Sequence, residues 1–156
     1  MSGYFTVRFP LGLVVVNHDE HGSLLGISFD LDYRTPESPP SSDIAGDLAR
    51  DLNSYLKGNP ELLDQPLDLS FASPFSRSAW TAARQIPFGS VISYGELAGS
   101  LGRAGGARAV GQAMGSNRFP LLIPCHRVVA QGGSLGGFAS GIRLKRWLLE
   151  LEGVTL

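Results

Sequence analysis

The sequence has a single cysteine, Cys125, among its 156 residues. One thiol cannot form an intramolecular disulfide, and it cannot supply the several thiolates of a cysteine-rich zinc site. Such a composition is typical of a reducing compartment, so we expect a cytoplasmic protein. Long apolar runs are also absent, since none approaches the roughly 20 residues that cross a bilayer. The first residues have neither the positive nor the apolar region of a secretory signal, and we expect no membrane partner.

Charged residues are few, at 17% against 43% hydrophobic residues, which is typical of a globular chain. The net charge of −1 hides an asymmetry between the two halves. Residues 1–73 carry 4 Lys and Arg against 11 Asp and Glu, a net of −7, whereas residues 74–156 carry 9 against 3, a net of +6. The basic half could attract an anionic polymer such as nucleic acid. Two oppositely charged faces that attract each other would explain the pattern equally well.

The first half begins with short runs that have the composition of β-strands. The runs are rich in aromatic, aliphatic and β-branched residues, and a turn-like segment separates the second from the third. They predict two or three antiparallel strands, at residues 4–9, 11–16 and 24–31. Residues 67–71 alternate between apolar and polar side chains, which predicts a further strand.

One helix is expected in the same half of the chain. Apolar residues recur at helical spacing between residues 44 and 56, with charged residues on another face. Ser42 or Asp43 would cap the start of this helix, and Gly58 would end it. Nothing in residues 1–73 brings chemical groups together, so we expect this half to be a scaffold lobe.

Residues 74–156 are expected to be mainly helical. Ser73 followed by Pro74 is a favourable helix start, and Ser93 with Glu96 forms a capping box. The apolar spacing predicts helices at residues 74–86, 94–101, 107–116 and 142–152. A glycine-bearing turn joins the second and third of these, which makes them a candidate helix-turn-helix.

In the last of these helices the apolar spacing predicts which side is buried. We expect Leu144, Leu148 and Leu151 to face the core, and Lys145 and Arg146 to point towards solvent.

The helix at 107–116 is unusually rich in small residues, namely Gly106, Ala107, Ala109, Gly111 and Ala113. Glycine weakens a helix by up to about 1 kcal/mol relative to alanine, so close approach of another surface is the expected reason for them. Arg108 and Gln112 lie one turn apart among these residues. The composition suits sequence-independent packing into a narrow groove of DNA, with the arginine as a wedge. Close helix–helix packing inside the lobe would explain it equally well.

The cysteine lies in the run Leu121–Val129, whose ends are apolar and whose centre is Pro124-Cys125-His126-Arg127. Polar functional side chains that interrupt an apolar run are expected at functional sites. A thiol beside a histidine suggests a nucleophile with its base, although a lone cysteine is more often buried and inert. On a regular strand Cys125 and His126 would point to opposite faces. They can therefore share one site only where the chain bends, and Pro124 favours such a bend.

A set of residues spread over the C-terminal half carries a family resemblance. The set comprises Ile86-Pro87-Phe88-Gly89, Ser93-Tyr94, Ala107-Arg108-Ala109-Val110-Gly111, Ala113-Met114, Asn117, Ile123-Pro124-Cys125-His126-Arg127-Val128-Val129, Gly136-Gly137-Phe138, Gly141, Lys145, Trp147-Leu148-Leu149 and Glu152. In this order and spacing it closely resembles the O6-alkylguanine-DNA alkyltransferases, the methylated-DNA–protein-cysteine methyltransferase family. Pro-Cys-His-Arg is its most specific part, and residues 1–73 match the family only in general pattern.

The resemblance implies a single-turnover methyltransferase that repairs DNA. An alkyl group would pass irreversibly from O6-alkylguanine, and from O4-alkylthymine, to Cys125. His126 would act as the base through a water, Glu152 would orient the histidine, and Asn117 would brace the site. Tyr94 would help to turn the nucleotide and would donate towards the base.

The partner implied is double-stranded DNA, bound through its minor groove, with the damaged nucleotide flipped out of the stack. Arg108 would fill the vacated place in the stack, and Ala107, Gly111, Gln112 and Tyr94 would also contact DNA. The substrate pocket would be lined by Met114, Pro120, Val128, Gly136, Phe138 and Ser140. Phe138 and Ser140 depart from the residues of many relatives, which alters the shape of this pocket.

The fold implied is α+β. A small antiparallel sheet with a helix would form an RNase H-like lobe, residues 1–73, and a mostly helical lobe with a winged helix-turn-helix would form residues 74–156. No cofactor or metal is implied, because the cysteines that hold zinc in some relatives are missing here. We expect a monomer in solution whose copies could bind DNA cooperatively.

Two other functions are compatible with some of these residues. A damage-recognition module would bind the lesion without chemistry, but relatives of that kind lack the cysteine. A cysteine–histidine hydrolase normally draws these residues from distant parts of the chain, whereas Cys125 and His126 are adjacent. Alkyl transfer is therefore the function that we expect.

Overall fold

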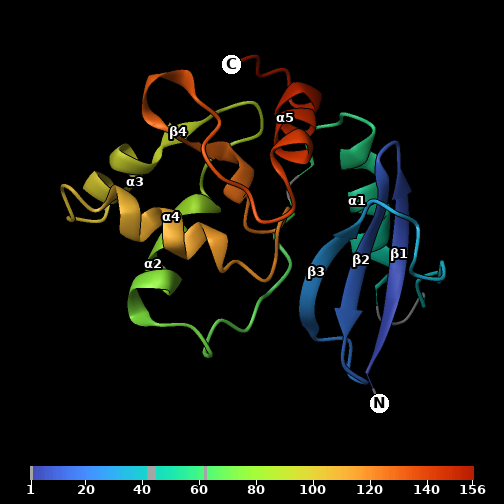
Figure 1. The fold of residues 1–156 in the computed structure, drawn as a ribbon. Helices are drawn as coiled ribbons and strands as arrows, with labels where there is room; N and C mark the ends of the chain where they lie inside the picture. Colours follow the sequence, from blue (N-terminus) through green and yellow to red (C-terminus); the bar gives the residue numbers. More distant parts are fainter. Residues whose placement is uncertain (1, 42–44, 62) are drawn as a thin grey trace. The chain divides into compact units, whose positions relative to one another are not determined.

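The computed structural model describes residues 2–41, 45–61 and 63–156 (Figure 1). The chain divides into two compact units, residues 1–68 and 69–156. A small three-stranded antiparallel sheet, together with several helices, confirms the predicted α+β class. No helix in the described ranges combines the length and the apolar character that crossing a membrane requires.

The sheet of the first unit consists of β1 (Gly3–Phe9), β2 (Gly12–His18) and β3 (Leu24–Asp30), in that spatial order. Both neighbouring pairs are antiparallel, and Val16 of the central strand lies between Phe5 and Ile27. These three side chains are buried. The runs of apolar and β-branched residues therefore form the antiparallel strands that the sequence predicted.

Helix α1 (Gly46–Leu56) packs against β1. Its buried residues follow the predicted helical spacing and are Leu48, Ala49, Leu52, Tyr55 and Leu56. Gly58 adopts a φ of 97°, and its amide donates to the Tyr55 carbonyl at 2.8 Å. The helix thus ends next to the glycine that was expected to end it. The predicted caps Ser42 and Asp43 lie outside the described residues.

The predicted strand at residues 67–71 is wrong. No strand within the described ranges pairs with this segment, and Ala72 N donates to the Leu69 carbonyl at 3.1 Å in a turn. A strand requires a hydrogen-bonded neighbour as well as an alternating sequence. Here the alternation reflects only alternating exposure along a connecting segment.

Within residues 69–156, all of which are described, the α-helices are α2 (Pro74–Ala83), α3 (Tyr94–Ser100), α4 (Ala107–Gly115) and α5 (Ile142–Leu151). Each corresponds to a predicted helix. Helices α2 and α3 pack against α4. Trp80 of α2 is fully buried, and its indole N–H donates to the Ala113 carbonyl of α4 at 2.8 Å.

Serine side chains cap α2 and α3 as predicted. Ser73 Oγ accepts from Ser76 N at 3.2 Å, and Ser93 Oγ accepts from Glu96 N at 3.0 Å. A cap of this kind stabilises a helix by about 1 kcal/mol.

Two very short strands bring the start of α3 to the cysteine segment. Strand β4 (Ile92–Ser93) pairs in parallel with β5 (Val128–Val129). Tyr94 directly follows β4, and β5 directly follows the 3₁₀ turn η1 (Cys125–Arg127). This pairing places Tyr94 on the same side of the unit as the cysteine.

Helix α5 buries a different face from the predicted one. Its buried residues are Leu144, Lys145, Leu148 and Leu149, whereas Leu151 is partly exposed. The expectation that Lys145 points towards solvent is wrong, since its exposed fraction is 0%. At about 100° per residue, Lys145 lies between Leu148 and Leu149 around the helix axis. The predicted face relied on Leu151 and left Leu149 out.

Candidate active site

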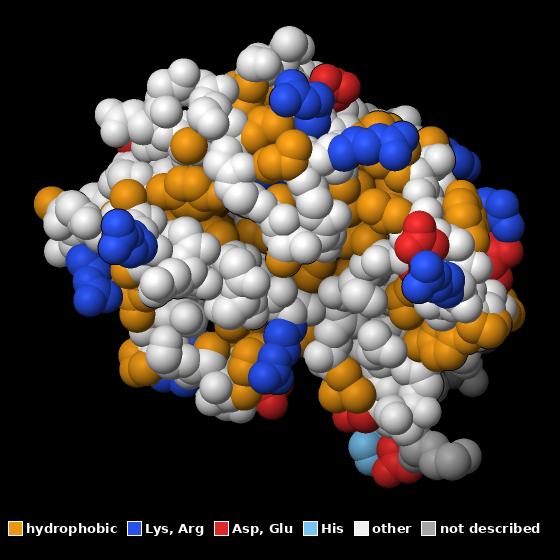
Figure 2. Space-filling view, in the orientation of Figure 1, with side chains coloured by type: hydrophobic (Ala, Val, Ile, Leu, Met, Phe, Trp, Pro, Cys, Tyr) orange, Lys and Arg blue, Asp and Glu red, His pale blue; other side chains and the backbone are white. Residues whose placement is uncertain are grey.

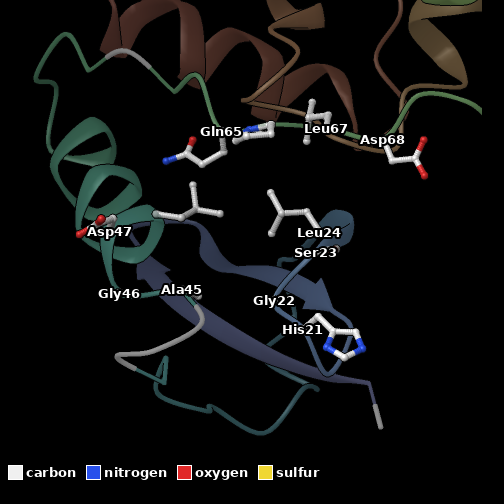
Figure 3. A pocket seen from close by; sticks show the side chains of 12 residues that line it. His21, Gly22, Ser23, Leu24, Ala45, Gly46, Asp47, Gln65, Leu67 and Asp68 are labelled. Carbon is white, nitrogen blue, oxygen red and sulfur yellow. The ribbon is translucent and has the colours of Figure 1, made fainter.

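The thiol lies in a smaller cavity than the one in the first unit. The cavity of the first unit has a volume of about 640 Å³ and is bordered by the turn before β3, the start of α1 and residues 65–68. Figure 3 shows Leu24 on one side of it and Gln65 and Leu67 on the other. In the second unit, one cavity of about 540 Å³ lies beside α2, and another of about 260 Å³ has Cys125 in its wall. Because the only thiol lies there, the smaller cavity is the candidate site.

The walls of the smaller cavity come from α3, α4, η1 and the glycine-rich loop at residues 131–141. They consist of Tyr94, Gly111, Met114, Gly115, Cys125, Gly137, Phe138 and Ala139. Met114 and Phe138 were predicted pocket residues, whereas the predicted Pro120, Val128, Gly136 and Ser140 lie outside this lining. Val128 is fully buried in β5, and Gly136 packs against the ring of Tyr94. A Cβ at Gly136, where φ is 75°, would lie 2.7 Å from that ring, so only glycine permits this approach.

The chain bends after Pro124, so the side chains of Cys125 and His126 point in different directions without lying on opposite faces. Arg127 N donates to the Pro124 carbonyl at 2.9 Å, which closes η1. Successive side chains on such a turn are about 120° apart instead of on opposite faces. Cys125 lines the cavity, and the His126 ring turns inward to Glu152.

Cys125 is 6% exposed, and burial raises the pKa of its thiol. A hydrogen bond from the Asn117 side chain, the positive charge of Lys145 and the backbone amides of Cys125 and His126 oppose this rise. Burial outweighs them, so the thiol is protonated at neutral pH. The sulfur therefore needs a base when it reacts.

His126 Nε2 lies 2.6 Å from Glu152 Oε2, deep inside the unit. Burial lowers the pKa of His126 by more than the Glu152 carboxylate raises it, so the imidazole is neutral at pH 7. Burial alone would raise the pKa of Glu152, but hydrogen bonds from His126, Arg127 and Gly89 lower it to about 2. An ionised carboxylate only accepts hydrogen bonds. Nε2 therefore carries the proton, and Nδ1 is the basic nitrogen of His126.

Arg127 holds the opposite side of Glu152. Its Nε donates to Oε1 at 2.8 Å and its Nη2 donates to Oε2 at 3.0 Å, while Nη1 donates to the Ile86 carbonyl at 2.8 Å. The Gly89 amide donates to Oε1 at 3.0 Å. This fork gives the carboxylate one orientation, and the carboxylate in turn orients the His126 ring.

Asn117 braces the segment that leads to the cysteine. Its Nδ2 donates to the Ile123 carbonyl at 2.9 Å, and its Oδ1 accepts from Phe119 N at 2.8 Å. Both ends of the side chain are thus tied to the loop before Cys125, so Asn117 holds that loop in one conformation.

The structure adds Lys145, a residue to which sequence reasoning assigned no role. Its Nζ donates to the carbonyls of Val128 and Gly137, at 2.8 and 3.0 Å, and to Tyr94 Oη at 3.3 Å. Burial lowers the pKa of Lys145 to about 8. The sequence could have predicted the burial of Lys145 if Leu149 had been included in the apolar face of α5, because position 145 then lies within that face.

The residues predicted to contact DNA lie along α4, apart from Tyr94. Arg108 and Gln112 are exposed, and Ala107 and Gly111 are half-buried. None of the hydrogen bonds, ion pairs or ring contacts among the described residues involves Arg108. On the face drawn in Figure 2, Lys and Arg side chains are scattered among hydrophobic and uncharged ones and do not form one continuous patch.

Together, the fold and the site define a cysteine-dependent enzyme. One thiol lines a small cavity, and a neutral histidine held by a carboxylate adjoins it in the chain. In the part of the chain that the structure describes, no group of three or more His, Cys, Asp and Glu residues is placed to hold a metal ion.

Known proteins are similar to this chain in sequence. Residues 74–154 match the family described as 6-O-methylguanine DNA methyltransferase, DNA binding domain. The methylated-DNA–protein-cysteine methyltransferase of Shigella flexneri is 39% identical over 145 residues, which are 92% of this chain and 85% of that protein. The methylated-DNA–protein-cysteine methyltransferase of Saccharolobus islandicus is 37% identical over 158 residues, covering 100% of this chain and 99% of that protein.

Solved structures agree with the sequence relatives. Mycobacterium tuberculosis OGT in complex with DNA superimposes with a TM-score of 0.80 at 37% identity, over 96% of this chain and 91% of that one. The O6-methylguanine-DNA methyltransferase of Pyrococcus kodakaraensis gives a TM-score of 0.73 at 29% identity, over 99% and 100%. The chain therefore belongs to the methylated-DNA–protein-cysteine methyltransferase family, as the resemblance predicted. It is a DNA-binding methyltransferase of DNA repair.

Proposed function

We propose that the protein accepts the alkyl group of O6-alkylguanine, and of O4-alkylthymine, on Cys125 in one irreversible turnover. One observation carries this proposal: the Cys125 thiol lines a cavity of about 260 Å³ while the neighbouring His126 is held by Glu152. The sequence relatives support the reaction, and the relative solved with DNA supports the partner.

In the proposed step, Cys125 Sγ attacks the alkyl carbon, the S–C bond forms and the C–O6 bond breaks. The electron pair leaves with the guanine, and the thiol proton passes through a water to His126 Nδ1. Glu152 stabilises the imidazolium, and Tyr94 donates to the departing base. An ordinary thiol is only a few per cent ionised at neutral pH, so its full ionisation would gain about thirtyfold, or about 2 kcal/mol. Because burial raises the pKa of Cys125, the base His126 gains more than this here. Holding sulfur and alkyl carbon in line accelerates the step further.

For DNA binding, α3 and α4 would act as a winged helix-turn-helix that meets the minor groove. The small residues of α4 suit close approach of a duplex, and a flipped base would enter the cavity beside Cys125. Residues 1–73 would serve as the scaffold lobe and residues 74–156 as the DNA-binding lobe. We infer a monomer in solution.

The intact mass of the protein after incubation with O6-methylguanine duplex DNA tests this function. We expect a gain of one methylene per molecule, mapped by peptide mass to Cys125, and no further gain with excess DNA. Tight binding without a change in mass would favour damage recognition alone. Catalytic turnover of an ester or peptide would favour a hydrolase.

Arg108→Ala is expected to slow transfer from duplex DNA about tenfold to a hundredfold, because the arginine would no longer fill the gap left by the flipped base. This corresponds to about 1.4–2.8 kcal/mol, within the few kcal/mol that unstacking costs. Transfer from the free base O6-methylguanine should stay nearly unchanged. Single-turnover rates on both substrates measure the difference. Arg146→Ala removes the same charge from an exposed position on α5 and serves as the control. Equal losses on both substrates would contradict the wedge.

A further inference from the structure

The turn that leads to the cysteine contains a leucine in a backbone conformation that leucine rarely adopts. Leu121 has a φ of 77°, and its side chain is buried. A positive φ brings the Cβ of a bulky residue too close to the backbone, which costs free energy. Ile123 N donates to the Phe119 carbonyl at 2.8 Å and closes the turn around Leu121. Such a conformation persists only where the surrounding structure holds it.

Asn117 is one of the side chains that hold this turn. Its two ends are tied to Phe119 N and to the Ile123 carbonyl. The same side chain forms a hydrogen bond with the Cys125 sulfur, which opposes the rise in the pKa of the thiol. The position of the sulfur therefore depends on the position of the whole turn, residues 117–123.

An aromatic ring outside the turn makes a second set of contacts with it. The guanidinium carbon of Arg118 lies over the Phe71 ring, 3.8 Å from its centre. The centre of the Phe119 ring lies 6.4 Å from the same point. Two successive residues of the turn thus contact one ring, and this fixes the direction of the peptide between them. Leu121 follows that peptide by two residues.

Phe71 is itself anchored to α2. Its ring centre lies 5.8 Å from the ring of Trp80, which is fully buried. Ring centres about 4.5–7 Å apart are typical of attractive aromatic pairs. Arg77 Nη1 donates to the carbonyl of Ala72, the residue after Phe71, at 3.1 Å. The Phe71 ring is therefore a fixed support for the turn.

Arg118 has no carboxylate partner in this arrangement. Its side chain is exposed, and Phe71 is 44% exposed. None of the ion pairs among the described residues involves Arg118. The attraction between a guanidinium and the face of an aromatic ring is what holds the pair together.

We propose that Phe71 and Arg118 are positioning residues that hold the turn at residues 117–123, so that the Cys125 sulfur lies in line with the alkyl carbon. The proposal rests on the alkyl transfer proposed above. Neither residue lines the cavity that contains the thiol, so both act through the turn.

Phe71→Ala is expected to lower the maximum single-turnover rate of methyl transfer about tenfold, because the sulfur is less often in line with the alkyl carbon. A displacement of about 1 Å at a reacting centre can cost about a hundredfold. Arg118→Ala should lower the maximum rate about threefold, as expected for an exposed contact between a cation and a ring. The concentration of O6-methylguanine duplex DNA that gives half of the maximum rate should stay unchanged in both variants.

Conservative and combined variants test whether the contact itself matters. Phe71→Tyr keeps the ring and should restore the wild-type rate, whereas Phe71→Leu keeps only an apolar side chain and should lose at least threefold. The double variant Phe71→Ala/Arg118→Ala should be no slower than Phe71→Ala, because Arg118 acts through the ring. Losses that multiply in the double variant, or a loss in Phe71→Tyr as large as in Phe71→Ala, would overturn the proposal.

An exposed arginine could instead contact a DNA phosphate, and the free base separates the two roles. Positioning of the sulfur should lower transfer from free O6-methylguanine by the same factor as transfer from duplex DNA. A loss confined to duplex DNA, with a higher half-saturating concentration that depends less on salt, would mean that Arg118 contacts DNA and would refute the proposal. Arg146→Ala removes an exposed charge from α5 and should match the wild type on both substrates.

The pH profile of the maximum rate distinguishes positioning from a change in ionisation. Holding the turn changes where the sulfur lies, so Phe71→Ala should keep the shape of the wild-type profile at a lower rate. A profile displaced along the pH axis would contradict the proposal, because the substitution would then act on the ionisation of Cys125.

Thermal unfolding checks that the variants are folded at the assay temperature. If Phe71→Ala does not fold, Phe71→Leu and Arg118→Ala are compared by the same measurements. A wild type that gains no methyl group would refute the alkyl transfer itself. A wild type that reacts while the folded variants keep its maximum rate would refute only the role of Phe71 and Arg118.

Discussion

Cys125→Ser is expected to abolish methyl transfer, with a loss of more than about a thousandfold, while the fold and DNA binding remain. A serine hydroxyl ionises far less readily than a thiol, and the neutral His126 is too weak a base to ionise it. The substitution replaces one small side chain, 6% exposed, by another of similar shape, so little packing is lost. Intact mass after incubation with O6-methylguanine DNA and gel retardation of the same mixture measure the two properties.

No second cysteine can accept the methyl group in this test. Cys125 is the only cysteine, so a methyl group found on the serine variant would have to lie on a residue of another type. Such a gain would contradict the assignment of Cys125 as the acceptor. Loss of DNA binding together with loss of transfer would show that the substitution disturbs more than the nucleophile.

Glu152→Gln is expected to slow transfer about a hundredfold or more and to destabilise the fold. A neutral amide cannot stabilise the imidazolium that His126 becomes, which removes much of the benefit of general base catalysis. Arg127 would keep a buried charge without its carboxylate, and breaking a buried pair costs about 3–5 kcal/mol. Single-turnover rates and urea unfolding at neutral pH measure the two effects. Glu150→Gln, at an exposed position of α5, is the matched control.

The same residue predicts how stability depends on pH. The folded pKa of Glu152 is about 2, below the ordinary 4.5, so its contribution is fully present above 4.5 and is lost as pH falls towards 2. The difference of about 2.5 pH units corresponds to about 3 kcal/mol. His126, whose pKa is also lowered, adds a loss that starts below its ordinary 6.5. Urea unfolding between neutral pH and about pH 3 should therefore show less acid sensitivity in Glu152→Gln than in the wild type. Equal slopes would contradict the burial of an ionised Glu152.

The sequence correctly predicted the structural features that are set by contacts between residues close together in the chain. The serine caps at Ser73 and Ser93 and the glycine at 58 act within a few residues, so their sequence context was sufficient. The same reasoning was wrong for residues 67–71, because pairing with another strand is not a local property.

The site, too, has residues that the sequence predicted and residues that it did not. The sequence pointed to Cys125 and His126 from their place in an apolar run, and it pointed to Glu152 and Tyr94 only through a family resemblance. It placed Lys145 on the wrong side of α5, since helical spacing does not show which of two adjacent faces finds a partner surface.

By itself, then, the sequence showed one thiol next to one histidine in an apolar run, and it predicted most of the segments that form strands and helices. Tertiary structure alone decided that Glu152, Arg127, Gly89 and Lys145 surround that centre. The physical reason is that burial and hydrogen-bond geometry set the charge and direction of each polar group. Both arise only when the chain from Gly89 to Glu152 has folded on itself.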